Sequence, residues 1–169
     1  SSTTPPAQPI YFWRPHASNG YLSQWYPSPF TLSGPTEHYA TAEMYMMVRK
    51  ARLFGDESTA QKMLQTADAR VHKRLGRRVQ GFDDEVWDQH KLDIVAQGNY
   101  YKFTVSRDAG RLRGWLMSTG ERELVEASPL DRIWGIGFAE KDAGGRREDW
   151  GENLLGRVLE GVRGRIRRE

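Results

Sequence analysis

A glutamate and a lysine share one predicted helix whose other residues favour burial. Over Thr36–Phe54, apolar residues recur at steps of three and four, the period of an amphipathic helix. The seven-residue step from Glu43 to Lys50 returns to nearly the same face, roughly 10 Å along the helix axis. A small ligand could bridge that span, so the pair predicts acid/base chemistry. In the alternative interpretation, both side chains extend into solvent, as most helix charges do.

A second pair of carboxylates flanks a predicted turn. Glu126 lies at the end of a predicted strand, and Asp131 follows after the turn at Pro129. Loops at strand ends commonly carry catalytic groups. Asp131 is equally suited to capping a turn, so both roles stay open.

Glycines follow these carboxylates. Trp134 stands beside Gly135 and Gly137, and glycines in such a pattern mark the close approach of a ligand or of another main-chain segment. Asn153 stands at the predicted start of the last helix, where free N–H groups can bind an anion. Its alternative is an ordinary helix cap.

The composition excludes several kinds of chemistry. The chain has 169 residues and no cysteine, which rules out disulfides, a thiolate nucleophile and sulfur-ligated zinc. The four histidines show no paired ligand spacing, so we expect no metal and no cofactor. No apolar run reaches membrane-span length and no secretory signal is recognisable, so we expect an intracellular protein, cytoplasmic or nuclear, without membrane contact.

Charge and aromatic residues are unevenly distributed. The net charge is +3, and arginines concentrate at the C-terminus and around residues 73–78. Such clusters can attract phosphates or nucleic acid, or they can be solvated helix ends. The aromatic-rich stretch Ile10–Phe30 predicts short strands and an ordered loop, whose rings either close the core or line a pocket for a planar ligand.

The remaining pattern predicts a disordered leader over residues 1–9 and one domain over residues 10–169. Further helices are expected at 58–67 with a capping box from Ser58, at Ala69–Leu75, from Asp83 or Asp84 to near Gly98, at Leu112–Met117, and from Glu152 or Asn153 onward. Strand-like patterns occupy 101–103, Arg122–Ala127 and Asp131–Phe138, and a polar loop is expected over Lys141–Arg147.

Five blocks in order resemble the motifs of the NADAR family, the YbiA-like proteins. The blocks are Ser23–Phe30 (SQWYPSPF), Glu37–Asp56 (EHYATAEMYMMVRKARLFGD), Lys73–Val79 (KRLGRRV), Leu124–Gly137 (LVEASPLDRIWGIG) and Trp150–Gly156 (WGENLLG). Ser23-Gln24-Trp25 departs from the Ser-Asn-Phe that is commoner in the family. The resemblance implies a compact single-domain α+β fold, mainly helical with a small β component.

The resemblance also implies N-glycosidase activity on ribose-linked nitrogen. Two substrate classes are known for the family: ADP-ribose on the guanine amino group of DNA or RNA, and phosphoribosylamino-pyrimidine intermediates of riboflavin biosynthesis. We favour ADP-ribosylated guanine, with the chain acting as a monomer. Alternatives are a module that only binds ADP-ribose or NAD, and a domain that packages nucleic acid through its arginine tail.

Our candidate residues fall into two groups. The catalytic candidates are Glu43, Lys50, Asp131 and Glu126, and the substrate-binding candidates are Trp25, Asn19, Tyr39, Trp134, Gly135, Gly137, Asn153 and Arg77. Glu43 is the first choice as acid or base, with Asp131 next. Lys50 permits a second route through a Schiff base at ribose C1.

Overall fold

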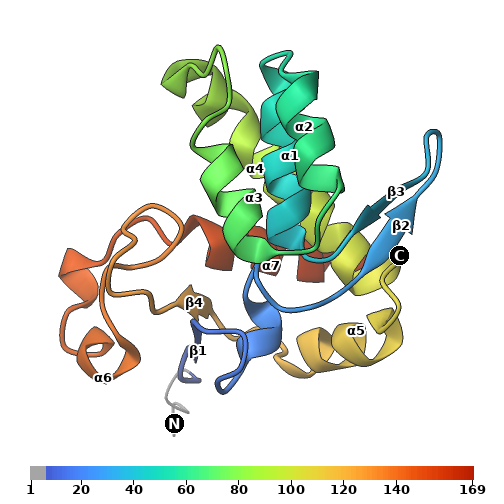
Figure 1. Cartoon of the computed structure of the whole chain (residues 1–169). Helices are drawn as coiled ribbons and strands as arrows, with labels where there is room; N and C mark the ends of the chain where they lie inside the picture. Colours follow the sequence, from blue (N-terminus) through green and yellow to red (C-terminus); the bar gives the residue numbers. More distant parts are fainter. Residues whose placement is uncertain (1–6) are drawn as a thin grey trace, which may run out of the picture. The chain divides into compact units, whose positions relative to one another are not determined.

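The computed structural model describes residues 7–169, which divide into two compact units (Figure 1). The central unit is Gln24–Gly114, and the terminal unit joins the described residues up to Ser23 with Trp115–Glu169. The predicted disordered leader over residues 1–9 lies mostly outside the described residues. Within its described part, the main-chain oxygen of Gln8 accepts a hydrogen bond from Arg122 Nε at 2.7 Å.

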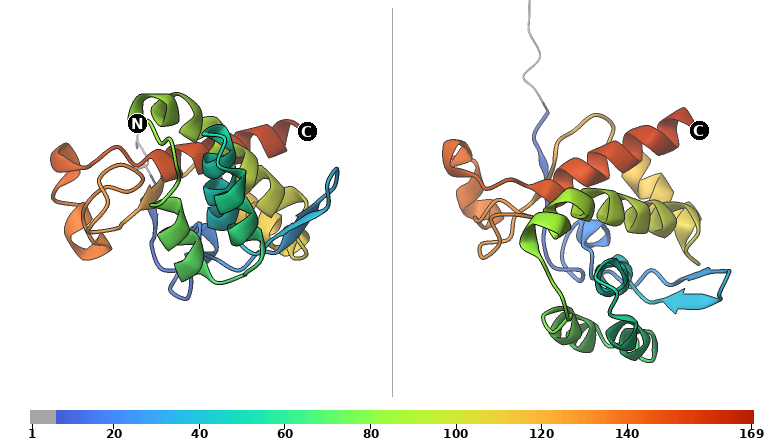
Figure 2. Two further views of the ribbon diagram at one scale, coloured as in Figure 1. Left: turned by 45° about the horizontal axis from the view of Figure 1, so that its top comes forward. Right: turned by 90° about the horizontal axis from the view of Figure 1, so that it is seen from above.

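The central unit is built on one helix. Its elements are β2 (Phe30–Leu32), β3 (Glu37–Tyr39), α1 (Ala42–Leu53), α2 (Glu57–Leu64), α3 (Ala69–Gly76) and α4 (Asp84–Thr104), and α5 (Ala109–Ser118) begins in this unit and ends in the terminal one. The helices α2, α3 and α4 all pack against α1. Figure 2 shows α2 and α3 on one side of α1 and α4 on the other. The strands β2 and β3 pair antiparallel.

Nearly all of α1 is buried. Eight of its residues lie in the interior, among them Met44, Tyr45 and Val48. Close packing with α4 depends on Gly98, where an added Cβ would lie 2.7 Å from the Tyr45 ring. Gly98 was expected to end this helix, but the helix runs on to Thr104. The glycine is therefore a contact point for α1 and not a helix stop.

The terminal unit holds a two-stranded parallel sheet and a long helix. Its elements are β1 (Ile10–Phe12), a 3-10 helix (Gly20–Leu22), β4 (Leu124–Glu126), α6 (Glu140–Ala143), a second 3-10 helix (Arg147–Asp149) and α7 (Leu154–Arg168). The register pairs Ile10 with Leu124 and Phe12 with Glu126. The helix α7 packs against β4, and its apolar residues Leu155, Leu159 and Val162 are buried.

The prediction of a mainly helical α+β chain with a small β component is confirmed. Several boundaries were wrong. The helix predicted from Thr36 begins only at Ala42, because Glu37–Tyr39 forms β3 instead and pairs with β2. The capping box expected at Ser58 is replaced by Asp56, whose carboxylate accepts the Thr59 N–H at 3.1 Å.

Two other segments also differ from expectation. The predicted strand-like alternation over Asp131–Phe138 is a series of bends, and the polar loop after it contains α6. The pattern at Tyr101 and Phe103 lies inside α4. Within residues 7–169, none of the helices is both long and apolar enough to cross a bilayer.

Candidate functional site

Glu43 lies in the first turn of α1. Thr41 caps this helix, with its Oγ1 accepting the Met44 N–H at 3.0 Å. The Glu43 N–H donates to the main-chain oxygen of Gln24 at 3.0 Å. Glu43 is only 9% exposed. The alternative that Glu43 extends into solvent is therefore excluded.

Lys50 lies two turns further along α1 in an aromatic setting. Its Nζ donates to the main-chain oxygen of Gly76 at 2.9 Å. The ammonium also lies 4.6 Å from the centroid of the Phe82 ring and 5.7 Å from that of Trp87. An ammonium has three donors, and a ring face attracts a cation. Lys50 is thus held in place while part of its donor capacity stays available.

The pKa of Lys50 is lowered from its ordinary value. Burial is the largest cause, and the negative charges of Glu43 and Asp84 act in the opposite direction. Glu43 and Lys50 therefore interact electrostatically, as expected for two residues on one side of α1. A lysine with a lowered pKa has a larger neutral fraction, and the neutral amine is the nucleophilic form.

The end of α3 contributes further groups to the central unit. Lys73 Nζ lies 5.6 Å from the centroid of the Trp25 ring. Arg77, at the C-terminal cap of α3, is exposed. Gly76 packs so closely on α1 that an added Cβ would collide with the Met47 sulfur. Both predicted binding residues of this region, Trp25 and Arg77, therefore belong to the same unit as Glu43 and Lys50.

A buried polar group behind α1 was missed by the sequence reasoning. Asn99 on α4 is fully buried, and its Nδ2 donates to Gln24 Oε1 at 2.7 Å. Gln24 in turn accepts the Glu43 N–H through its main-chain oxygen. Lys102, one turn after Asn99, is also fully buried, and burial lowers its pKa to about 7. The sequence signal was weak because α4 was predicted to end before these residues.

Tyr39 makes packing and hydrogen-bond contacts within the central unit. Its ring stacks on Phe30 with centroids 5.3 Å apart, and its hydroxyl donates to Glu37 Oε1 at 3.0 Å. Glu37 also pairs with Arg52 at 2.6 Å. Burial, and next the hydrogen bond to Glu37, raise the pKa of Tyr39. Tyr39 lies at the edge of a cavity described below, and its hydroxyl is already engaged.

In the terminal unit, Asn153 ties α7 to β4. The residue adopts φ 52° and its side chain makes no capping bond to α7. Instead, Oδ1 accepts the Glu126 N–H at 3.0 Å and Nδ2 donates to Leu124 O at 2.9 Å. The ordinary side-chain cap left open by the sequence is therefore not formed. Glu126 is half-buried at the end of β4.

Asp131 shapes the turn that carries Trp134. Its Oδ1 accepts the N–H groups of Ile133 and Trp134, each at 2.9 Å. This is the turn-capping role that the sequence left open beside the catalytic one. An added Cβ on Gly135 would lie 2.8 Å from Glu126 O, so this glycine permits the close approach of another main-chain segment. Gly137 adopts φ +78°, which glycine tolerates without strain.

The start of α7 is occupied by this same turn. Leu154 and Leu155 donate their N–H groups to Ile133 O and Trp134 O, both at 3.1 Å. The prediction of free N–H groups for an anion is wrong for these two donors, because loop carbonyls already accept them. Asn19, the remaining candidate, has φ 60° and donates from Nδ2 to Tyr11 O at 3.1 Å.

The predicted residues thus form two sets, one in each unit. The central unit joins an acid, an amine with a lowered pKa and aromatic rings, which suits proton transfer or covalent catalysis at an electrophilic carbon. In the terminal unit, Asp131 and Asn153 make hydrogen bonds to the main chain. Over residues 7–169, no group of three or more potential metal ligands is found.

Known proteins resemble this chain over most of its length. The sequence matches the NADAR domain over residues 11–167. An N-glycosidase of Acanthamoeba polyphaga mimivirus is 44% identical, covering 84% of this chain and 85% of that protein. A riboflavin biosynthesis protein of Vibrio vulnificus is 32% identical, covering 92% of this chain but 38% of that protein.

The fold also has a solved counterpart. The NMR structure of the Escherichia coli protein YbiA superposes with a TM-score of 0.74 at 24% identity, covering 95% of this chain and 85% of that one. Fold and sequence agree on one class, a mainly helical α+β protein of the YbiA type. The chain belongs to the NADAR family.

Proposed function

We propose that the chain is an N-glycosidase that removes ADP-ribose from guanine bases in DNA or RNA by cleaving the bond between ribose C1 and nitrogen. The observation that carries the proposal is the pairing of buried Glu43 with Lys50, whose pKa burial lowers, on one side of α1. Membership of the NADAR family and the 44% identity to a protein named N-glycosidase support the class of reaction.

Glu43 serves as the acid in the proposed reaction. Cleavage leaves a negative charge on the departing guanine nitrogen, so a proton delivered there lowers the barrier. In the direct route, water attacks C1 as the nitrogen leaves, and the carboxylate of Glu43 then takes a proton from that water.

Lys50 acts as the nucleophile in a covalent route. The aminal ring-opens to an imine between C1 and the guanine nitrogen, and the neutral Lys50 amine adds to C1. The protonated guanine amine then leaves, so that one C–N bond breaks and another forms. Water hydrolyses the resulting Schiff base, releasing ADP-ribose and restoring the amine. Burial lowers the pKa of Lys50 and so enlarges the neutral fraction of the amine that this route needs.

The two routes differ in what borohydride traps. Enzyme turning over an oligonucleotide with one ADP-ribosylated guanine is reduced, digested and mapped by mass spectrometry. The covalent route gives a stable adduct on Lys50, whereas an active enzyme without an adduct requires direct attack by water. In the covalent route, Lys50→Met gives no adduct. Its matched control is Lys62→Met, which removes an exposed lysine of α2.

The proposed function itself is tested by release of ADP-ribose from the same oligonucleotide. We expect turnover with the intact chain and a loss of about 10²- to 10⁴-fold with Glu43→Gln. Tight binding without any release would instead make the chain an ADP-ribose-binding module. Binding that falls steeply with salt and ignores the modification would indicate a nucleic-acid-packaging domain.

A second substrate class follows from one comparison. The Vibrio vulnificus relative is named a riboflavin biosynthesis protein, and this chain aligns with 38% of it. Phosphoribosylamino-pyrimidine intermediates of that pathway carry the same kind of C1–N bond. Measuring kcat/KM for both substrates decides between them, since a preference for the pyrimidine intermediate would overturn the assignment to guanine.

A further inference from the structure

The central unit contains a groove that holds neither Glu43 nor Lys50. Its volume is about 510 Å³, which lies in the size range of small-molecule sites. Its walls come from β2, β3, the first turn of α1, the end of α2 with the loop after it, and the loop before α5. The lining residues are Pro29, Phe30, Thr31, His38, Tyr39, Ala40, Met44, Leu64, Gln65, Thr66, Ala67 and Arg107.

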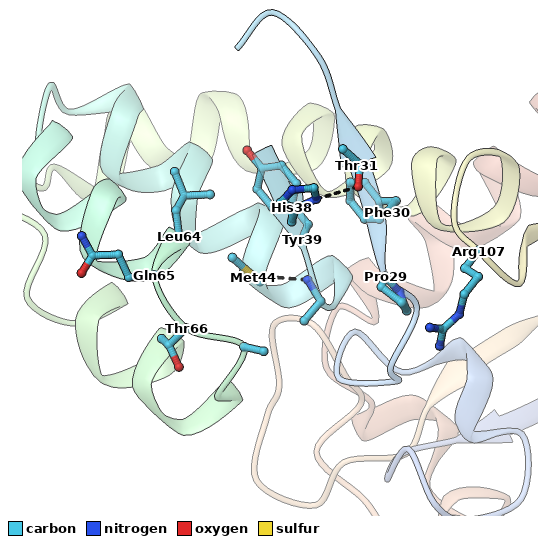
Figure 3. Close-up of a pocket in the computed structure, with 12 residues that line it drawn as sticks. Pro29, Phe30, Thr31, His38, Tyr39, Met44, Leu64, Gln65, Thr66 and Arg107 are labelled. Carbon is cyan, nitrogen blue, oxygen red and sulfur yellow. Dashed lines mark hydrogen bonds between the residues drawn. The ribbon is translucent and has the colours of Figure 1, made fainter. Parts of the chain in front are cut away.

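The inner surface of the groove is apolar. Figure 3 shows Met44 in its middle, with Pro29 on one side and Leu64 on the other. The Met44 sulfur accepts the Ala40 N–H at 3.3 Å, which fixes the thioether. Met44 is only 2% exposed and forms the floor of the groove, and the partly buried Pro29 and Leu64 offer apolar surface on either side of it. This surface suits a planar ring system.

Polar groups surround this apolar surface. Thr31 Oγ1 and His38 Nδ1 are hydrogen-bonded at 2.8 Å, which orients the imidazole ring (Figure 3). Gln65 and Thr66 stand on the opposite side. An amide, a hydroxyl and an imidazole supply both donors and acceptors, as the edge of a nucleobase requires.

Arg107 is the charged member of the groove. Its main-chain N–H is fixed to Pro29 O at 2.9 Å, and Figure 3 places its guanidinium beside Pro29. Within the part of the chain that the structure describes, this guanidinium has no ion-pair partner, and no Asp or Glu lines the groove. A guanidinium binds phosphate through two parallel hydrogen bonds. The groove thus favours an anion next to a flat ring.

We propose that this groove is a second binding site that takes a nucleotide, with its base between Pro29 and Leu64 over the buried Met44 and its phosphate on Arg107. The proposal rests on the proposed function in one respect, because the nucleotide then belongs to the strand that carries the modified guanine. A free mononucleotide has the same chemistry and is the other source. The exposed rim residues His38, Gln65 and Arg107 leave the groove open to either.

Methionine-methyl NMR of the full chain tests the proposal without any turnover. The chain is labelled at its methionine methyl groups and titrated with AMP or with a short single-stranded DNA that carries no modification. The Met44 signal is expected to shift because this methionine lines the groove, whereas Met63, which does not line it, and Met117, in the terminal unit, serve as internal references. An unmoved Met44 signal with both ligands overturns the proposal.

Arg107→Ala and the matched variant Arg113→Ala distinguish specific nucleotide binding from non-specific electrostatic attraction. Both arginines are exposed and belong to the central unit, and Arg113 does not line the groove. Loss of Arg107 is expected to weaken binding about tenfold, as for a charged hydrogen-bonded pair, and loss of Arg113 less than about twofold. Equal losses indicate non-specific attraction and overturn the site.

AMP and unmodified DNA distinguish a free nucleotide from a nucleotide of the strand. The binding assay and the ADP-ribose release assay distinguish the groove proposal from the proposed function. Arg107-dependent binding of DNA without binding of AMP supports a nucleotide of the strand, and the reverse supports a free nucleotide. If ADP-ribose release fails while Arg107-dependent binding persists, the proposed function is wrong and the groove stands. If release occurs and Arg107 is irrelevant to binding, only the groove is refuted.

Discussion

The two units employ their polar residues differently. In the central unit, Glu43 and Lys50 interact electrostatically, and Lys50 Nζ is surrounded by aromatic rings. In the terminal unit, Asn153 joins α7 to β4, and Asp131 organises a turn, through hydrogen bonds to the main chain. Both sets lie in motifs of the same family. Polar residues in a motif are therefore of two kinds, those that can do chemistry and those that hold the backbone in place.

The sharpest test of this difference is Glu43→Gln. The amide keeps the shape of the side chain but cannot deliver or take a proton, so hydrolysis should fall about 10²- to 10⁴-fold. Release of ADP-ribose from a modified oligonucleotide measures it. Glu57→Gln, at the exposed first turn of α2, is the matched control and should keep activity. Full activity in Glu43→Gln would remove this glutamate from the mechanism.

Lys102 provides a test inside the central unit that does not depend on activity. Its pKa is lowered to about 7 by burial, so between that pH and its ordinary pKa it is neutral in the fold and protonated in the unfolded chain. Unfolding then takes up a proton, and the free energy of unfolding rises with pH across this window. Below pH 7 both states are protonated and the contribution is flat.

Urea unfolding at pH 7 and pH 9 measures the effect. From pH 7 to pH 9, the intact chain should gain roughly 2 kcal/mol more than Lys102→Met, in which the titrating group is absent. Lys62→Met, on the exposed side of α2, should keep the slope of the intact chain. An unchanged slope in Lys102→Met would show that the lysine is charged in the fold.

Asn153→Ala tests the structural role of the terminal unit. The change leaves the buried Leu124 O and the Glu126 N–H without partners, and we expect a loss of about 2–3 kcal/mol in the free energy of unfolding. Asn153→Gly should lose about 1 kcal/mol less, since glycine adopts the left-handed backbone of this position freely. If both variants unfold like the intact chain, the side-chain bonds to β4 contribute nothing.

Substitutions of Asp131 have the smallest expected effects. They distinguish a role in shaping the turn from a role in catalysis. Asp131→Asn keeps the Oδ1 acceptor of the turn, so stability should change by less than about 0.5 kcal/mol, whereas Asp131→Ala should cost about 1 kcal/mol. Activity of Asp131→Asn should fall less than about tenfold if the carboxylate only shapes the turn. A loss beyond about a hundredfold at unchanged stability would make Asp131 part of the chemistry.

Local sequence determined the parts of the fold that depend on near neighbours. The three- and four-residue spacing located α1, α3 and α7, and it placed Glu43 and Lys50 on one side of α1, because helix periodicity is a property of the chain itself. The sequence also showed directly that the chain has no cysteine and that its four histidines lack paired ligand spacing. The motif blocks identified the family before any coordinates.

Only the tertiary structure decided the rest, because those features depend on partners distant in sequence. Glu37–Tyr39 is a strand and not the start of α1, since it pairs with Phe30–Leu32. The helix α4 continues past Gly98, and the absence of a side chain there lets Tyr45 of α1 pack against it. The segment after Asp131 alternates like a strand, yet its carbonyls accept N–H groups from the start of α7. The burial of Lys102 and the use of Asn153 as a tie to β4 likewise come from packing between elements that sequence periodicity cannot place.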